Sequence, residues 1–224
     1  MMSLDPSMTA APFVAGGTDC TYTPGGPGIR AVAGDGRTPR EAAERPDRAA
    51  DPDPGDSEAL SLSELCDQIV GTHHVSLRAD LARLGALSRQ VARQHGDSAP
   101  CLGTLNVVFQ DLADRLETHL LKAEVMLFPA IRHLEAGRVA DAPFGSHLQA
   151  PLKLLTEEHG AIHAALAGLR GVPHGGAPLE ELPPSVRELL GGLAGLERGV
   201  REYLDREARV LFPRALARFG TVGV

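Results

Sequence analysis

The segment HLLKAEVMLFP, which begins at His119, decides the fold because YLDREARVLFP, which begins at Tyr203, repeats it. The two segments align without a gap through the shared Leu-Phe-Pro. The same register extends upstream, since His74 lies 45 residues before His119 and His159 lies 44 residues before Tyr203. Each half of the chain therefore predicts a pair of helices, with a histidine on the first and an [H/Y]-x-x-x-[A/E] element on the second.

Apolar residues follow the spacing of one buried helix face on both sides of this repeat. They recur in steps of three and four, and the polar residues of the repeat fall on the same stripes. The predicted core faces are Leu105, Val108, Leu112, Leu116, His119, Ala123 and Met126; Leu152, Leu155, His159, Ile162, Leu166 and Leu169; and Val186, Leu189, Leu193, Leu196, Val200, Tyr203, Glu207 and Val210.

Helix boundaries follow from capping and breaking residues. We expect helices at 61–95, at 102–129 with a turn or two beyond Pro129, at 151–169, and from Ser185 onward. Ser61 with Glu64, and Ser185 with Glu188, each have the spacing of a capping box. The sequence thus predicts an all-α protein, with an antiparallel up-down four-helix bundle over residues 59–220.

Residues 1–58 have a different composition. They hold 8 Pro and 8 Gly, with 10 acidic residues against 5 Arg, and few large apolar side chains. Such a segment buries too little surface to offset the entropy lost on ordering, so we expect a disordered acidic arm.

Charge and cysteine content narrow the class of protein. A net charge of −7 and a pI near 5.7 argue against nucleic acid or an anionic membrane as the main partner. The three cysteines have neither zinc-finger nor disulfide-framework spacing, and no apolar run reaches the length of a membrane span. We expect a cytoplasmic protein with neither nucleic acid nor membrane as its partner.

A buried charge points to a metal site. The predicted bundle would bring His74, His119, His159, Tyr203 and Glu207 toward one axis, as bundle cores do when they build metal sites. An ionised Glu207 in such a core must be protonated, ion-paired or bound to a cation. A metal would explain the carboxylate and the histidines together.

Each of these residues also has an ordinary structural role. A lone histidine on an apolar face is usually a hydrogen-bonded core residue, and Glu207 could pair with an arginine such as Arg78. His73 fits the stripe as well as His74 does, and only the repeat favours His74. His163 lies one turn after His159 and is either a further ligand or a residue at the surface edge.

The segment from Ser61 to Leu216 resembles the hemerythrin-like (HHE cation-binding) family, and within it the repair-of-iron-centres subfamily of di-iron proteins. The motifs that carry the resemblance are HGDSAP after the first helix, the two LFP elements, EEH at 157–159 and LFPRAL at the end. The resemblance implies iron as the cofactor, with His74, His119 and His159 as ligands and Glu207 as a bridging carboxylate.

Two positions depart from the family pattern. Ala123 stands where the family has a bridging glutamate, and Tyr203 stands where it has a histidine. Glu124 is adjacent to the lost glutamate but is rotated about 100° around the helix. A Tyr203 phenolate could restore the missing negative charge of a di-iron site, or the remaining residues could hold a single iron.

The resemblance implies a role in nitrosative or oxidative stress, through iron-sulfur cluster repair or through binding and sensing of NO or O2. Iron-sulfur proteins are then the expected partners, and a non-enzymatic metal-binding protein is favoured over a mononuclear iron oxidase. The subfamily also carries paired N-terminal cysteines, where this chain has only Cys20. The alternative is a metal-free bundle that acts as an interaction module.

Overall fold

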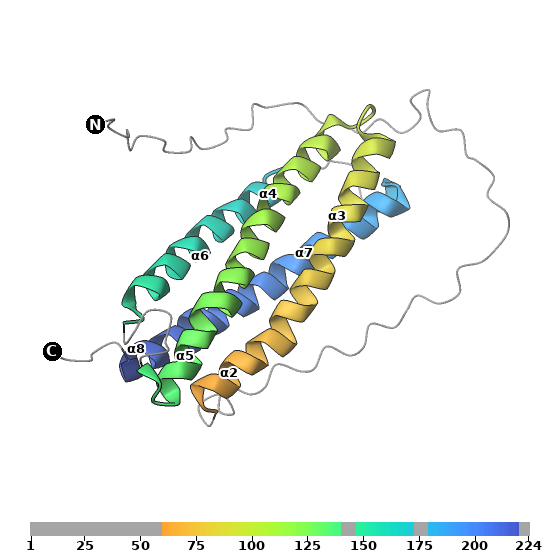
Figure 1. Cartoon of the computed structure of the whole chain (residues 1–224). Helices are drawn as coiled ribbons and strands as arrows, with labels where there is room; N and C mark the ends of the chain where they lie inside the picture. The colour runs from red at the N-terminus through yellow and green to blue at the C-terminus, as the bar shows by residue number, and fades with distance from the viewer. Residues whose placement is uncertain (1–59, 140–146, 173–178, 220–224) are drawn as a thin grey trace, which may run out of the picture.

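A computed structural model describes residues 60–139, 147–172 and 179–219, and in these ranges the chain forms four long helical rods that run side by side (Figure 1). The predicted arm at 1–58 lies outside the described residues. Successive rods run in opposite directions, as the colour gradient of Figure 1 shows. The prediction of an all-α antiparallel bundle is confirmed.

Three of the rods are built from several segments. The first comprises α2 (Leu62–Ile69), η1 (Val70–His74) and α3 (Val75–His95). The second comprises α4 (Pro100–Lys122), η2 (Ala123–Leu127) and α5 (Phe128–Glu135), and the third is α6 (Gln149–Arg170). A short 3₁₀ turn, η4 (Leu179–Glu181), precedes the fourth rod, which comprises α7 (Pro184–Arg206), η5 (Glu207–Leu211) and α8 (Phe212–Phe219).

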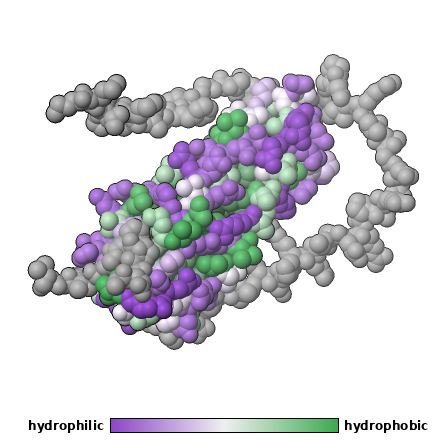
Figure 2. All heavy atoms as spheres, in the orientation of Figure 1, coloured by the Kyte–Doolittle hydropathy of each residue, from purple (hydrophilic) through white to green (hydrophobic). Residues whose placement is uncertain are grey.

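The core lies along the axis between the rods. α3 packs against α4 and α7, and α4 packs against α6. All six residues of the stripe predicted for α6 are buried, and so are the residues of the α7 stripe from Val186 to Tyr203. On the face shown in Figure 2, hydrophilic side chains cover much of the described surface, with smaller hydrophobic groups between them. No helix in the described ranges is both long enough and apolar enough to cross a bilayer.

Three single π-helical turns interrupt the rods. In η2 the amide of Phe128 donates to the carbonyl of Ala123, and in η5 the amide of Phe212 donates to the carbonyl of Glu207. A proline follows directly in both places, where it has no amide to donate and, in a regular helix, would clash with the carbonyl four residues earlier. The wide turn therefore lets each rod continue through its Leu-Phe-Pro.

The π-turns also shift the buried face by one residue. Met126 and Val210, which a regular helix would place in the core, are only half-buried. Leu127 and Leu211 are buried in their place. The predicted stripes are thus wrong beyond Ala123 and Glu207, because one extra residue in each turn rotates everything that follows.

The two predicted capping boxes have different outcomes. Ser61 and Glu64 form the reciprocal pair, with the Ser61 amide donating to Glu64 over 2.8 Å and the Glu64 amide donating to Ser61 over 3.2 Å. The box predicted at Ser185 is wrong, because α7 begins one residue earlier, at Pro184, and no side chain caps it. Proline suits the first helical position, since it has no amide that needs a partner there.

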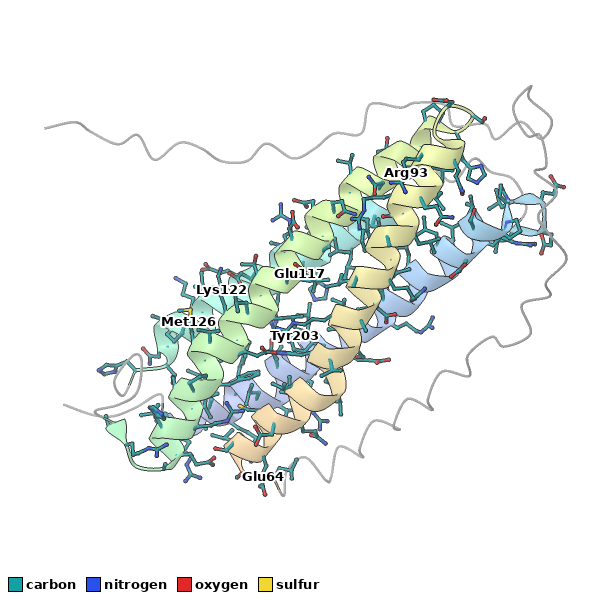
Figure 3. The ribbon with its side chains drawn as sticks, turned by 45° about the vertical axis from the view of Figure 1, so that its right-hand side comes forward. Glu64, Arg93, Glu117, Lys122, Met126 and Tyr203 are labelled. Atoms are coloured by element: carbon teal, nitrogen blue, oxygen red, sulfur yellow. The ribbon has the colours of Figure 1, made fainter. Side chains whose placement is uncertain are left out.

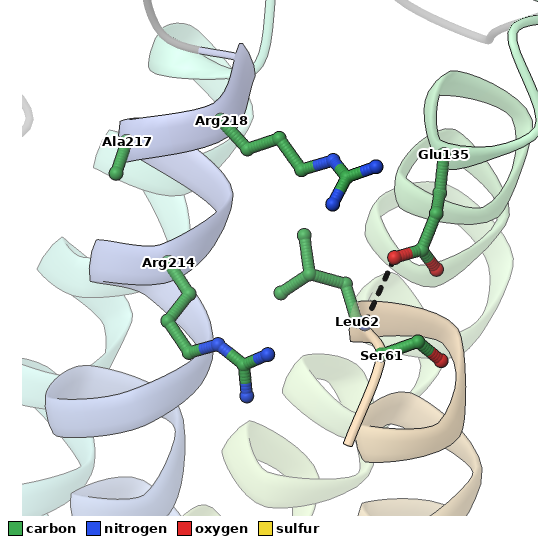
Figure 4. Close-up of a pocket in the computed structure, with 6 residues that line it drawn as sticks. All are labelled: Ser61, Leu62, Glu135, Arg214, Ala217 and Arg218. Carbon is green, nitrogen blue, oxygen red and sulfur yellow. Dashed lines mark hydrogen bonds between the residues drawn. The ribbon is translucent and has the colours of Figure 1, made fainter. Parts of the chain in front are cut away.

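Glu135, at the end of α5, adds a tertiary cap to α2. Its carboxylate accepts the amides of Leu62, over 3.1 Å, and of Ser63, over 2.8 Å. Figure 4 shows the contact with Leu62 at the edge of a pocket that Arg214 and Arg218 also line. The cap ties the start of the first rod to the end of the second.

The Glu135→Ala variant should therefore lower the free energy of unfolding by about 1 kcal/mol, the usual value of a helix cap. Urea unfolding followed by circular dichroism measures this change. Glu157→Ala, which removes an exposed glutamate from α6, is the matched control and should leave the midpoint unchanged. Equal midpoints for Glu135→Ala and the wild type would show that the cap contributes no stability.

Candidate metal centre

Three buried side chains converge at the centre of the bundle. His119 comes from α4, His159 from α6 and Glu207 from the first position of η5. One ligand atom from each lies within 4.8 Å of the other two, and Glu207 is fully buried. The sequence predicted these three to meet, and the structure brings them together.

Both histidines direct their Nε2 atoms at the same oxygen. Nε2 of His119 lies 3.1 Å from Oε2 of Glu207, and Nε2 of His159 lies 3.0 Å from it. Because an ionised carboxylate only accepts hydrogen bonds, both histidines donate here. A buried Glu207 was expected to be protonated, ion-paired or bound to a cation, and this structure shows it ion-paired.

The pKa values follow from this arrangement. Burial opposes ionisation of Glu207, but hydrogen bonds from His119 and His159 outweigh it and hold the carboxyl pKa at about 2. Burial likewise opposes protonation of His119, yet the bonds to Glu207 and Glu158 raise its pKa above the ordinary 6.5. Without a cation, protons thus balance the charge of Glu207.

Tyr203 and His74 lie beside this triad. The ring of Tyr203 lies 5.0 Å from that of His74 and 5.8 Å from that of His119, measured between centroids. Figure 3 shows Tyr203 in the interior between the rods. Burial, followed by the charge of Glu207, raises the pKa of the Tyr203 phenol well above 10, so the phenol needs a cation in order to ionise.

Three polar atoms around this point have no hydrogen-bond partner among the described residues. They are Nε2 of His74, the hydroxyl of Tyr203 and Oε1 of Glu207, and all three are buried. Leaving a buried polar atom unpaired costs on the order of 1–3 kcal/mol, so native proteins rarely do so without a reason. One nitrogen and two oxygens are a donor set that suits a hard cation, and the residues present therefore fit a metal.

Charged residues outside the triad form hydrogen bonds with Nδ1 of two histidines, His74 and His119. His74 donates from Nδ1 to Oε1 of Glu124 over 2.7 Å, and Arg78 pairs with both oxygens of that carboxylate. His119 donates from Nδ1 to Glu158 over 2.9 Å, and Lys122 pairs with Glu158. These contacts leave Nε2 of both histidines directed at the interior.

The remaining predictions for the site have mixed outcomes. Arg78 pairs with Glu124 and not with Glu207, so that alternative is wrong. His163 is exposed and takes the surface position that was one of its two predicted places. His73 is buried beside His74, with its ring 6.1 Å from that of Tyr203, and lies outside the triad.

The sequence reasoning missed the role of Glu158 and Lys122. The clue was available, because Glu158 directly precedes His159 and Lys122 lies one turn after His119. A contact between two different helices, however, depends on how they are rotated about their axes. Periodicity along either helix alone does not give that rotation.

The metal-free protein should lose stability as pH rises from 6.5 to about 8, below the ordinary cysteine pKa. A raised folded-state pKa of His119 contributes stability that is complete below 6.5 and is lost as pH rises through that folded pKa. Burial lowers the pKa of His74, so its folded form stays neutral, and its opposite contribution to stability is small above pH 7, where the unfolded imidazole is also mostly neutral. Melting temperatures measured in chelator at each pH give the profile.

The Glu207→Gln variant is the control for that profile. It removes one of the two charged partners of His119 and leaves Glu158, so its melting temperature should vary less across the same window. A wild-type melting temperature that rises or stays level between these pH values would contradict the assignment to His119.

Comparison with known proteins agrees with this geometry. Residues 67–215 match the family model of the hemerythrin HHE cation binding domain. The iron-sulfur cluster repair protein YtfE of Escherichia coli O1:K1 / APEC is 27% identical over 162 residues, which are 72% of this chain and 70% of that protein. The YtfE protein of Escherichia fergusonii gives the same identity and coverage. The chain belongs to the hemerythrin HHE cation-binding domain family.

Proposed function

We propose that this chain is a non-haem iron protein that binds iron at the centre of its bundle and acts in the repair of iron-sulfur clusters. Family membership supports cation binding, and the YtfE relatives support both iron and the repair role. The observation that carries the proposal is the triad of His119, His159 and Glu207, which adjoins three unpartnered buried atoms.

The donor atoms divide into two groups that share Glu207. His119 and His159 would hold one iron together with Oε2 of Glu207. His74 and Tyr203 would hold a second iron together with Oε1 of Glu207. This division uses every polar atom that the interior leaves unpaired, which favours two irons over one.

Charge supports the assignment of a phenolate to the second position. Ala123 removes one of the two carboxylates that the family uses, and Glu207 alone supplies a single negative charge. A Tyr203 phenolate would restore the second, because a bound cation offsets the burial that otherwise keeps the phenol neutral. Oxygen donors of this kind suit ferric iron.

The core residues around the site also determine which small molecules could reach a bound iron. Bound iron would supply reversible binding of NO or O2, and electron exchange. Leu120, Leu127 and Phe128 are buried around the ligand turn and exclude bulk water from it. Ala123, one turn after His119, has only a methyl group where the family has a carboxylate, so we expect the diatomic to enter beside it.

The cellular setting is part of the proposal. Cys66 and Cys101 are buried and form no disulfide among the described residues, as is usual for proteins of a reducing cytoplasm. Iron-sulfur proteins damaged by NO or by oxidants are the partners. Cys20, outside the described residues, is the only N-terminal cysteine, so the repair reaction here would proceed without the cysteine pair of the subfamily.

Anaerobic reconstitution with ferrous iron, followed by desalting and metal analysis, tests the site. The wild type should retain about two irons per chain, and Glu207→Gln should lose most of both, since its carboxylate serves both positions. Glu157→Gln, an exposed neighbour in sequence of Glu158, should retain them. A wild type that retains no iron would leave the metal-free interaction module as the function.

Tyr203→Phe tests the phenolate separately. After oxidation the wild type should show a visible phenolate-to-iron absorption, and the variant should lose this band together with about one iron. A band of unchanged intensity in Tyr203→Phe would show that Tyr203 is not a ligand. A wild type with a single iron and no such band would support a mononuclear site at the triad.

The repair role has its own test. The iron-loaded protein should restore activity to an iron-sulfur enzyme that NO has inactivated, and Glu207→Gln should not. Binding of NO without reactivation would contradict repair and would favour sensing or scavenging of the gas.

A further inference from the structure

Two of the three buried histidines that face the candidate metals, His74 and His119, share one arrangement of outer contacts. In each, Nδ1 donates to a glutamate on a neighbouring rod, and a cation from the histidine's own rod pairs with that glutamate. The contact reaches from the core to the surface: the side chain of His74 is 0% exposed, that of Glu124 is 26% exposed and that of Arg78 is 42% exposed.

The contact at Nδ1 decides which nitrogen of His74 is free. A neutral imidazole carries one proton, and a carboxylate 2.7 Å from Nδ1 keeps the proton there. The lone pair then lies on Nε2, which is buried without a partner and is directed at the interior. The same contact limits rotation of the ring, and both effects prepare a histidine to bind a metal.

Glu124 is of special interest in this chain because Ala123, the residue before it, supplies no carboxylate to the interior. The π-turn η2 begins at Ala123, so the two positions face different sides of the rod. Ala123 is buried, whereas the carboxylate of Glu124 reaches His74 from outside. The negative charge missing from the interior at 123 is thus present one layer further out.

We propose that Glu124 is a positioning residue of the metal centre, which holds His74 with Nε2 unprotonated and strengthens it as a donor where the inner carboxylate has been lost. The inference rests on the proposed function as far as metal binding is concerned. Arg78 contributes by pairing with both oxygens of Glu124, which fixes the plane of the carboxylate. Glu158 and Lys122 provide the corresponding contact for His119.

Three variants of the full chain distinguish the hydrogen bond that Glu124 accepts from the negative charge that it carries. Glu124→Ala removes the acceptor, Glu124→Gln keeps an acceptor oxygen without the charge, and Glu117→Ala removes an exposed glutamate two turns earlier on α4. Glu117 is the matched control, because it is exposed and comes from the same rod as Glu124. Because Glu124 is partly exposed, all three variants should fold, as circular dichroism and melting temperature would verify.

The first measurement needs no metal. Nitrogen-15 NMR of the imidazole atoms reports the position of the proton on His74. The wild type and Glu124→Gln should hold it on Nδ1, and Glu124→Ala should give a mixture with the proton also on Nε2. An unchanged proton position in Glu124→Ala would overturn the proposal.

The second measurement is ferrous iron affinity under anaerobic conditions, by competition with a chelator. Glu124→Ala should bind the second iron about 10- to 100-fold more weakly, Glu124→Gln should recover much of that loss, and Glu117→Ala should match the wild type. A purely structural role would lower the melting temperature and leave affinity and proton position unchanged. If the wild type binds no iron, the proposed function fails, and the NMR result alone decides whether Glu124 positions His74.

Discussion

The buried carboxylate of Glu207 is the constraint on which the rest of the bundle depends. An unpaired charge at a fully buried position would cost several kcal/mol, a large fraction of the stability of a domain this size. His119 and His159 offset that cost from two other rods, so the charge also fixes how three rods are rotated toward one another. The apolar stripes bring the helices together, but the polar contacts select one arrangement.

The π-turns lie at or next to residues of the candidate metal centre. One of them ends at His74, one begins a turn after His119, and one begins at Glu207 itself. A π-turn is less favourable than a regular turn and is common at functional sites, where it redirects a side chain that α geometry would point elsewhere. Here two of the three end one phenylalanine before a proline, so the Leu-Phe-Pro of the repeat and the ligand turn form one structural unit.

Much of this architecture could be predicted from sequence because it depends on patterns along single helices. The stripe of α6 and most of that of α7 are buried as predicted, and the internal repeat identified His119, His159 and Glu207 as residues that meet. Two kinds of feature could not be predicted. Regular periodicity carries no sign of a π-turn, which is why Met126 was expected in the core. Contacts between rods, such as that of Glu124 with His74, depend on rotations about helix axes that no single helix determines.

The π-turns also bear on how such a protein could change over evolutionary time. A π-turn is equivalent to one residue inserted into an α-helix, and the surplus is confined to that turn. Deleting one codon within η2 would therefore return the helix to regular geometry only if Pro129 were also replaced, because the proline ring would otherwise clash with the carbonyl four residues earlier. Losing the metal centre in this way while keeping the bundle would thus take two changes, and related bundles without a working centre would be recognisable by a gap of one residue together with the loss of the proline.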